Sequence, residues 1–213
     1  MPEYSLGRLV EHDPRSRTFR AATIAVKPRT VMWAHQAPVL DQGDIGQCTG
    51  AAMAQWLNTD YGGGRRLDIG DATDLYRLAT RLDGFPGVYP PDDTGSSGLA
   101  VCKAARKLGY ITAYRWTFSF QSFLSALSRS PLLVGTIWTE SMFTPDRDLF
   151  IKPAGDPVGG HEYLMVGVNV EGQYVTLLNS WGESWGYRGR ARITFADMAL
   201  LLAQQGDVKI PIR

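Results

Sequence analysis

Residues 159–195 have the sequence GGHEYLMVGVNVEGQYVTLLNSWGESWGYRGRARITF, which decides what kind of fold the chain can adopt. The apolar runs EYLMVGVNV, QYVTLLN and RARITF are short, often β-branched, and separated by glycine-containing turns. A similar run, LLVGTIW, precedes them at 132–138. Runs of this kind are typical of strands, so the second half of the chain is predicted to form an antiparallel sheet.

The first half of the chain has the spacing of helices instead. Apolar residues recur at helical intervals in three segments, 75–82, 99–108 and 120–127. The candidate ends are Asp71 or Thr73 as the first N-cap, Gly109 as the end of the second helix, and Ser119 as the third N-cap. Helices followed by strands indicate an α+β protein with two lobes, roughly 45–130 and 131–213. A cleft between the lobes is the expected position of a functional site.

Cys48 lies where the sequence DQGDIGQCTGAAMAQWLN changes from a polar, glycine-containing turn to an Ala-rich segment with high helix propensity. It is predicted to open a helix, where free backbone N–H groups and the helix macrodipole favour a thiolate. A cysteine at a helix start is, however, more often a small buried hydrophobic residue. This segment alone leaves both interpretations of Cys48 open.

The residues before Cys48 resemble the papain and cathepsin family of cysteine peptidases. PVLDQGDIGQC is similar to the stretch that leads to the nucleophile in that family, including a glutamine six positions before the cysteine, here Gln42. By this resemblance Cys48 is the nucleophile, and Gln42 joins the backbone N–H of Cys48 in an oxyanion hole. Without a second motif, a solvent-exposed glutamine in a turn would be the preferred interpretation of Gln42.

The stretch that begins at residue 159 is similar to the family's second motif, which runs from the catalytic histidine to Asn-Ser-Trp-Gly. The resemblance makes His161 the base, Asn179 the residue that orients its ring, and Trp181 the cover of their hydrogen bond. Trp185 is interpreted as structural. The interval from Cys48 to His161 is 161 − 48 = 113 residues, shorter than the ~130–150 typical of the family. Shorter loops would explain the difference.

The resemblance covers about residues 31–195 and implies a two-lobed, papain-like α+β fold. The N-terminal lobe would be mainly helical, the C-terminal lobe an antiparallel sheet or barrel, and the active site would lie in the cleft between them. Residues 1–30 are then an N-terminal extension and 31–213 the peptidase domain. The implied activity is hydrolysis of protein or peptide substrates through a thioester, with no cofactor or metal. Control by a long pro-segment is not expected, as in a bacterial-type or viral member.

Glu162 departs from the family pattern, which places a small residue after the catalytic histidine. By the resemblance, Glu162, Gly160 and Trp181 would contact substrate, with the carboxylate facing the pocket for the substrate's second side chain. A basic residue two positions before the scissile bond would then be preferred. Pairing of Glu162 with one of the chain's own arginines, or exposure to solvent, is the equal alternative. A second departure, Ile45 in place of a cysteine, excludes the family's usual disulfide there.

Composition limits the partners and the location. The 22 basic and 21 acidic residues give a formal charge of +1 without a run of like charges, so nucleic acid is not an expected partner. Neither a signal peptide nor a membrane-spanning segment is recognisable, so no membrane is expected. Two cysteines, Cys48 and Cys102, are too few for a disulfide framework and fit a cytoplasmic setting. A viral or assembly-associated location and the oligomeric state stay open.

Other interpretations have less support from the residues. GESWG matches the G-x-S-x-G motif around Ser184, but the histidine that this motif requires does not follow it. Cys102 falls on the apolar stripe of its predicted helix and is expected in the core. A peptidoglycan-directed amidase could share the Cys/His chemistry but would not require the contexts of Gln42 and Asn179. The serious alternative is an inactive papain-like homologue that binds peptides or serves a structural role.

Overall fold

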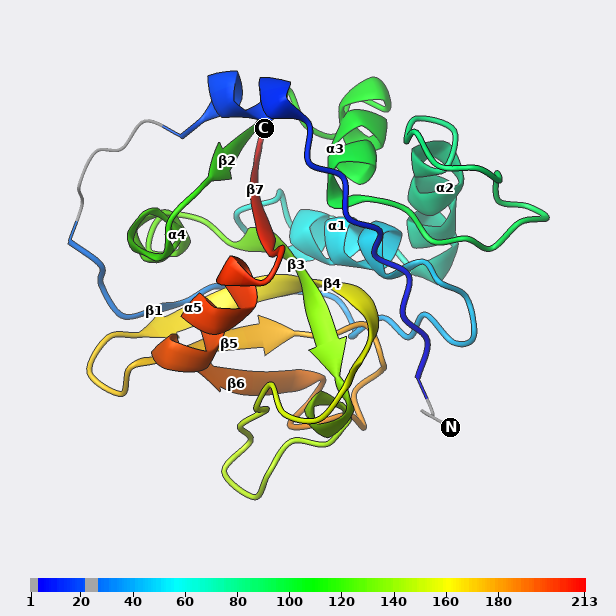
Figure 1. The fold of residues 1–213 in the computed structure, drawn as a ribbon. Helices are drawn as coiled ribbons and strands as arrows, with labels where there is room; N and C mark the ends of the chain where they lie inside the picture. The colour runs from blue at the N-terminus through cyan, green and yellow to red at the C-terminus, as the bar shows by residue number, and fades with distance from the viewer. Residues whose placement is uncertain (1–3, 22–26) are drawn as a thin grey trace.

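The computed structural model describes residues 4–21 and 27–213 (Figure 1). The elements of the described residues are, in chain order, η1 (Pro14–Phe19), β1 (Val31–Met32), α1 (Cys48–Asn58), α2 (Ile69–Ala79), α3 (Gly98–Lys107), β2 (Ala113–Thr117), α4 (Phe120–Leu127), β3 (Leu132–Thr139), η2 (Glu140–Phe143), β4 (Pro157–Asn169), β5 (Tyr174–Leu178), β6 (Arg190–Thr194), α5 (Phe195–Ala203) and β7 (Asp207–Ile212). The strands pair antiparallel in the order β2-β7-β3-β4-β5-β6, and β1 pairs with β4.

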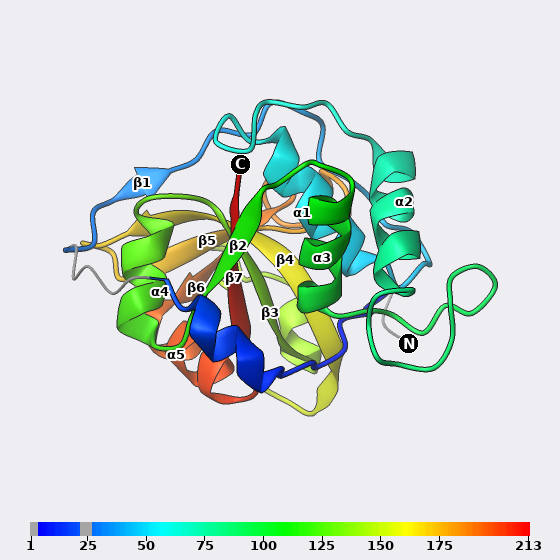
Figure 2. The ribbon, with the colours of Figure 1, turned by 90° about the horizontal axis from the view of Figure 1, so that it is seen from above.

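Helices cover the sheet from two sides, which Figures 1 and 2 show with α1, α2 and α3 on one side and α4 and α5 on the other. The central strands explain this arrangement, because their apolar residues alternate between two buried clusters. Leu133 and Leu164 face the cluster that contains α1, α2 and α3, while Val134 and Met165 face the second cluster. A strand covered on both faces reads as one continuous apolar run, as LLVGTIW does. The expected two-lobed α+β fold is confirmed.

Two elements that precede residue 131 belong to the sheet side of the molecule. Strand β2 pairs with β7 in the sheet, and Phe123, Leu124 and Leu127 of α4 belong to the second cluster. Elements of the sheet side therefore begin soon after α3. The four strands β3 to β6 lie where the sequence predicts strands, but β1, β2, β7 and α5 were not predicted.

The capping residues of the helices agree only in part with those expected from the sequence. The side chain of Asp68, not that of Asp71 or Thr73, caps α2, and Asp71 bonds back to the Asp68 backbone to complete a capping box. Ser119 caps α4 as predicted. Gly109 follows α3 with φ of 73°, the left-handed conformation expected of a glycine there. Among the described residues, no helix combines the length and apolarity needed to cross a membrane.

Candidate active site

Cys48 is the first residue of α1, and its side chain is completely buried. Burial raises the pKa of the Cys48 thiol to about 12, although hydrogen bonding from the backbone N–H groups of Glu162 and Thr49 acts in the opposite direction. Those interactions bring the start of α1 against β4 at the residue that follows His161. Two segments far apart in sequence, from the helical and the sheet side, therefore meet at the thiol.

His161 is held by Asn179 in one defined tautomer. Nε2 of His161 lies 2.7 Å from Oδ1 of Asn179, and the same oxygen accepts the backbone N–H of Ser180 at 2.8 Å. Because that oxygen is an acceptor, Nε2 must carry the hydrogen and Nδ1 keeps its lone pair. Burial lowers the pKa of His161 to about 4, against the opposing effect of the Asn179 hydrogen bond. The ring is therefore neutral and able to accept a proton at Nδ1.

Aromatic rings exclude water from the His161–Asn179 hydrogen bond. Trp181 stacks on the His161 ring with centroids 4.7 Å apart, and Trp138 contacts it edge-on at 4.9 Å. Trp185 donates its Nε1 hydrogen to the carbonyl of Phe143 and packs edge-on against Trp181. Trp181 therefore lies over the His161 ring, and Trp185 contacts Trp181 and the backbone of Phe143.

Gln42 connects the two sequence motifs. Its Oε1 accepts the hydroxyl hydrogen of Ser180 at 2.7 Å, and its backbone N–H donates to the Ser180 carbonyl at 2.9 Å. Nε2 donates one of its two hydrogens to the carbonyl of Ile45 at 2.9 Å. The buried amide is consequently fixed in orientation just ahead of Cys48, with a second N–H hydrogen still to be donated.

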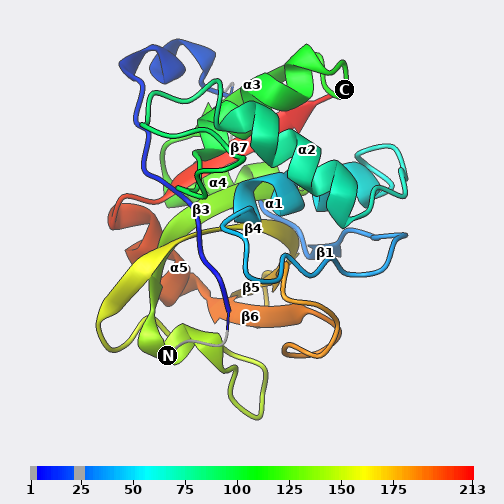
Figure 3. The same cartoon turned by 90° about the vertical axis from the view of Figure 1, so that its right-hand side faces the viewer.

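The N-terminal segment, defined as residues 4–9, runs across the front of β4 (Figure 3) and contacts the residues of this site. The backbone N–H groups of Gly7 and Arg8 donate to the carbonyl of Gly160 at 3.2 and 3.0 Å. On the opposite side Ser96 accepts from Leu9 and donates to Gly7, both at 2.8 Å. The segment therefore bridges the residue before His161 and the helical side, as an extended peptide would.

Contacts farther along the N-terminal segment seal the site. The carbonyl of Ser5 accepts the Nε1 hydrogen of Trp181 at 3.2 Å, and the ring of Tyr4 stacks on Trp181 with centroids 4.6 Å apart. Gly7 lies so close to Gly46 that a Cβ on Gly7 would overlap the Gly46 carbonyl. Arg8 and Ser96 form a parallel bridge. In the described structure the N-terminal segment therefore lies over the candidate active site, and we call this the closed arrangement.

The closed arrangement corrects one expectation about the thiols. Both cysteines are free, and both are buried. Cys102, on α3, lies in the buried cluster that α1, α2 and α3 form with the sheet, as predicted. Cys48, where the start of a helix was expected to favour a thiolate, is equally buried, and burial favours the neutral thiol.

Of the three residues assigned to substrate contact, Gly160 and Trp181 contact the N-terminal segment, whereas Glu162 is already paired. Oε1 of Glu162 lies 2.6 Å from Nζ of Lys209, and both side chains are completely buried. The partner is a lysine, not the arginine that the sequence considered. Asp207 and Lys209 on β7, like Arg8, were missed by the sequence interpretation. The alternation in DVKIPI, which puts residues 207 and 209 on one face of a strand, was the available signal.

The fold is shared with solved structures of cysteine proteases. Xylellain, a cysteine protease from Xylella fastidiosa, matches with a TM-score of 0.80 and 18% identity, over 99% of this chain and 96% of that chain. The chain has the papain-like fold. Two further papain-like matches are the bromelain protease of Ananas comosus (TM-score 0.63, 17% identity, 87% and 99% covered) and procathepsin L 3 of the Tenebrio molitor larval midgut (TM-score 0.68, 14% identity, 99% and 76% covered).

Among curated proteins, the gamete and mating-type specific protein A of Dictyostelium discoideum is 28% identical over 191 residues. The match covers 78% of this papain-like chain but 42% of that protein, so the chain spans less than half the length of the curated relative it matches. No protein-family model matches the chain.

Proposed function

We propose that the chain is a cysteine peptidase in which Cys48 is the nucleophile, His161 the base, Asn179 the residue that orients the base, and Gln42 part of the oxyanion hole. One observation carries the proposal. The hydrogen-bond pattern at Asn179 leaves Nδ1 of His161 as a free acceptor, without any hydrogen-bond partner, in the same buried site as the Cys48 thiol. A neutral imidazole with a free lone pair, on the residue before the backbone N–H that contacts the thiol, can act as the general base in thiol activation.

The reaction follows from these positions. His161 Nδ1 takes the thiol proton, and the Cys48 sulfur forms a bond to the scissile carbonyl carbon. The second N–H of Gln42 Nε2 and the backbone N–H of Cys48 stabilise the resulting oxyanion. The imidazolium then donates its proton to the leaving amine as the C–N bond breaks, which leaves a thioester. Water, deprotonated by His161, hydrolyses the thioester and restores the thiol.

Substrate reaches the site only after the N-terminal segment has left it, because the segment uses the Gly160 carbonyl and covers Trp181. The variant Gly7→Ala is a means of opening the cleft within the full chain, since the added methyl group would overlap the Gly46 carbonyl.

Cleavage of a denatured protein by variants of the full chain tests the proposal. Wild type and Gly7→Ala should release peptides, Gly7→Ala faster, and Cys48→Ala in the Gly7→Ala background should release none. Cys102→Ala is the matched control, because that cysteine is equally buried but lies in the core. Equal cleavage rates with and without the Cys48 sulfur would refute the mechanism.

A peptide-binding module without catalysis is the second candidate, because the cleft already holds an extended segment through backbone hydrogen bonds. That function requires no reactive thiol. It would be favoured if Gly7→Ala bound peptides but cleaved none of them. A cytoplasmic location stays a prediction from the two unpaired cysteines.

A further inference from the structure

The peptide group between Ile45 and Gly46, just ahead of the candidate nucleophile, is hydrogen-bonded at both its carbonyl and its N–H. The carbonyl of Ile45 accepts from Nε2 of Gln42 at 2.9 Å and from the backbone N–H of Gln47 at 2.8 Å. The N–H of Gly46 donates to Oδ2 of Asp93 at 2.9 Å. A single peptide group therefore connects the carboxylate of Asp93 to the side-chain amide of Gln42.

The Asp93 carboxylate is itself held by a buried tyrosine of α2. The hydroxyl of Tyr76 donates to Oδ1 of Asp93 at 2.6 Å and accepts the backbone N–H of Gly95 at 2.9 Å. Burial, together with the hydrogen bond to Asp93, raises the pKa of the Tyr76 hydroxyl above its ordinary value, so Tyr76 keeps the proton that it donates. Asp93 is exposed as a residue, yet both of its carboxylate oxygens have a partner, which fixes the plane of the carboxylate.

The orientation of this peptide group determines the orientation of Gln42. If the peptide rotated, its carbonyl would turn away from Nε2 of Gln42 and the amide would lose a partner. A charged acceptor on the N–H opposes that rotation, and it also polarises the peptide, which makes the carbonyl a stronger acceptor. Gly46 permits the close approach, because a Cβ there would lie 3.1 Å from Oδ1 of Asp93. With Ile45 excluding the usual disulfide, Asp93 is what ties this turn to the segment between α2 and α3.

We propose that Asp93, held by Tyr76, is a positioning residue that orients the side-chain amide of Gln42 through the Ile45–Gly46 peptide. One Nε2 hydrogen of Gln42 is engaged by the carbonyl that Asp93 holds in place, and the other is left for the carbonyl oxygen of a bound peptide. Asp93 acts through the peptide group and not on the reacting atoms. That the second hydrogen serves an oxyanion hole rests on the proposed function.

The first test needs no peptidase activity and measures the mobility of the Gln42 side-chain amide in the full chain by NMR relaxation of its nitrogen. The resonance is assigned by its loss in Gln42→Ala. Asp93→Ala should lower the order parameter of this amide to below about 0.6, the range of flexible groups. Asp93→Asn keeps an uncharged oxygen for the Gly46 N–H and should lie between Asp93→Ala and wild type. An unchanged order parameter in Asp93→Ala would overturn the proposal.

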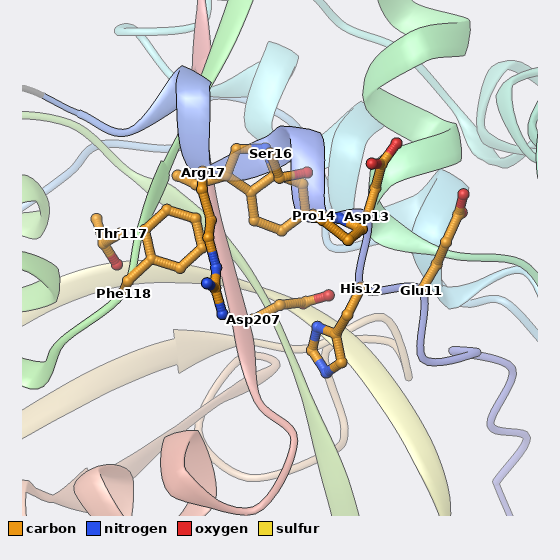
Figure 4. A pocket seen from close by; sticks show the side chains of 10 residues that line it. Glu11, His12, Asp13, Pro14, Ser16, Arg17, Thr117, Phe118 and Asp207 are labelled. Carbon is orange, nitrogen blue, oxygen red and sulfur yellow. The ribbon is translucent and has the colours of Figure 1, made fainter.

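Two other carboxylates provide matched controls. Asp92 is an exposed carboxylate next to Asp93 in the sequence. Asp13 also accepts a backbone N–H, that of Arg15 at 2.9 Å, but it lines a cavity of about 350 Å³ beside η1 (Figure 4). Asp92→Ala and Asp13→Ala should leave the Gln42 amide as ordered as in wild type. An equal loss of order in all three alanine variants would overturn the specific role of Asp93.

The second test is a double-mutant cycle on peptide cleavage, measured in the Gly7→Ala background. Gln42→Ala should lower kcat on the order of 10²-fold, the loss typical of one oxyanion-hole donor. Asp93→Ala should lower kcat about tenfold with little change in KM, because it misplaces that donor without removing it. Added to Gln42→Ala, Asp93→Ala should lower kcat no further, since the two residues act as one unit. The same loss in both backgrounds would show that Asp93 acts independently of Gln42 and would overturn the proposal.

The two tests separate this proposal from the proposed function. Peptide cleavage by Gly7→Ala, together with a rigid Gln42 amide in Asp93→Ala, would overturn the positioning role and leave the peptidase standing. The expected order parameters with no cleavage of any peptide would support the coupling of Asp93 to Gln42 and overturn the peptidase.

Discussion

Asn179 illustrates how much chemistry a single side-chain oxygen can determine. It accepts from both His161 and the Ser180 backbone, and this double role is what assigns the proton of the imidazole to Nε2. Loss of the Asn179 side chain would leave His161 in place but free to rotate and to change tautomer.

Asn179→Ala should therefore reduce activity without abolishing it. We expect kcat/KM in the Gly7→Ala background to fall by on the order of 10²-fold, within the range that general-base catalysis contributes. The pH profile should also change, because the ring loses a hydrogen bond that raises its pKa. Asn58→Ala is the matched control, since the Asn58 side chain is also buried but bonds only to the backbone of Leu67. A loss as complete as that of Cys48→Ala, or no loss, would contradict the orienting role.

The residues that sequence could and could not predict differ in how they are encoded. Cys48, Gln42, His161 and Asn179 lie within two continuous motifs, so local order was enough to propose their roles. Arg8, Asp207 and Glu162 meet only because β7 pairs with β3 and the N-terminal segment lies across β4. No local pattern specifies such a meeting of the two chain ends.

At the scale of elements, the N-terminal segment is the part whose role the sequence did not predict. Its backbone hydrogen bonds go to Gly160 and Ser96 and not to a helix or strand of its own. Its sequence therefore shows no helical or strand spacing of apolar residues. The strands, by contrast, were predictable where both faces are buried. Strands β2 and β7 have residues such as Arg115 and Lys209 that interrupt the apolar pattern.

Gly7→Ala should open the closed arrangement. Because an added methyl group would overlap the Gly46 carbonyl, the segment must move, and water then reaches Cys48. We expect iodoacetamide to modify Cys48 at least about tenfold faster than in wild type, with Cys102 unchanged. Ser5→Ala is the control, because only the backbone carbonyl of Ser5 bonds to Trp181. Unchanged reactivity of Cys48 would mean that the segment does not limit access.

At the scale of the whole molecule, two buried imidazoles make stability depend on pH. Burial lowers the pKa of both His35 and His161 from 6.5 to about 4. The unfolded chain therefore binds more protons than the folded chain as pH falls from 6.5 to 4, and stability is lost over that range. Glu162, whose pKa burial raises to about 7, acts in the opposite direction, so the total loss is smaller than the histidines alone would give.

A variant isolates the contribution of one histidine. When the pH is lowered from 7.5 to 5, the unfolding free energy of wild type should fall by about 2 kcal/mol more than that of His35→Gln. Denaturant unfolding at both pH values measures this difference. His12→Gln is the control, because His12 lines an open cavity at the surface. An identical pH dependence for wild type and His35→Gln would show that His35 is not held neutral.

Both the N-terminal segment and the proposed mechanism determine whether Cys48 can be acylated, so one measurement tests both. An activated peptide ester should acylate the enzyme faster than water deacylates it, which allows the intermediate to be trapped by acid and mapped by mass spectrometry. In Gly7→Ala the acyl group should be found on Cys48 alone, with less of it in wild type and none in Cys48→Ala. An acyl group on any other residue, or none in Gly7→Ala while the ester is hydrolysed, would contradict the assignment of Cys48 as the nucleophile.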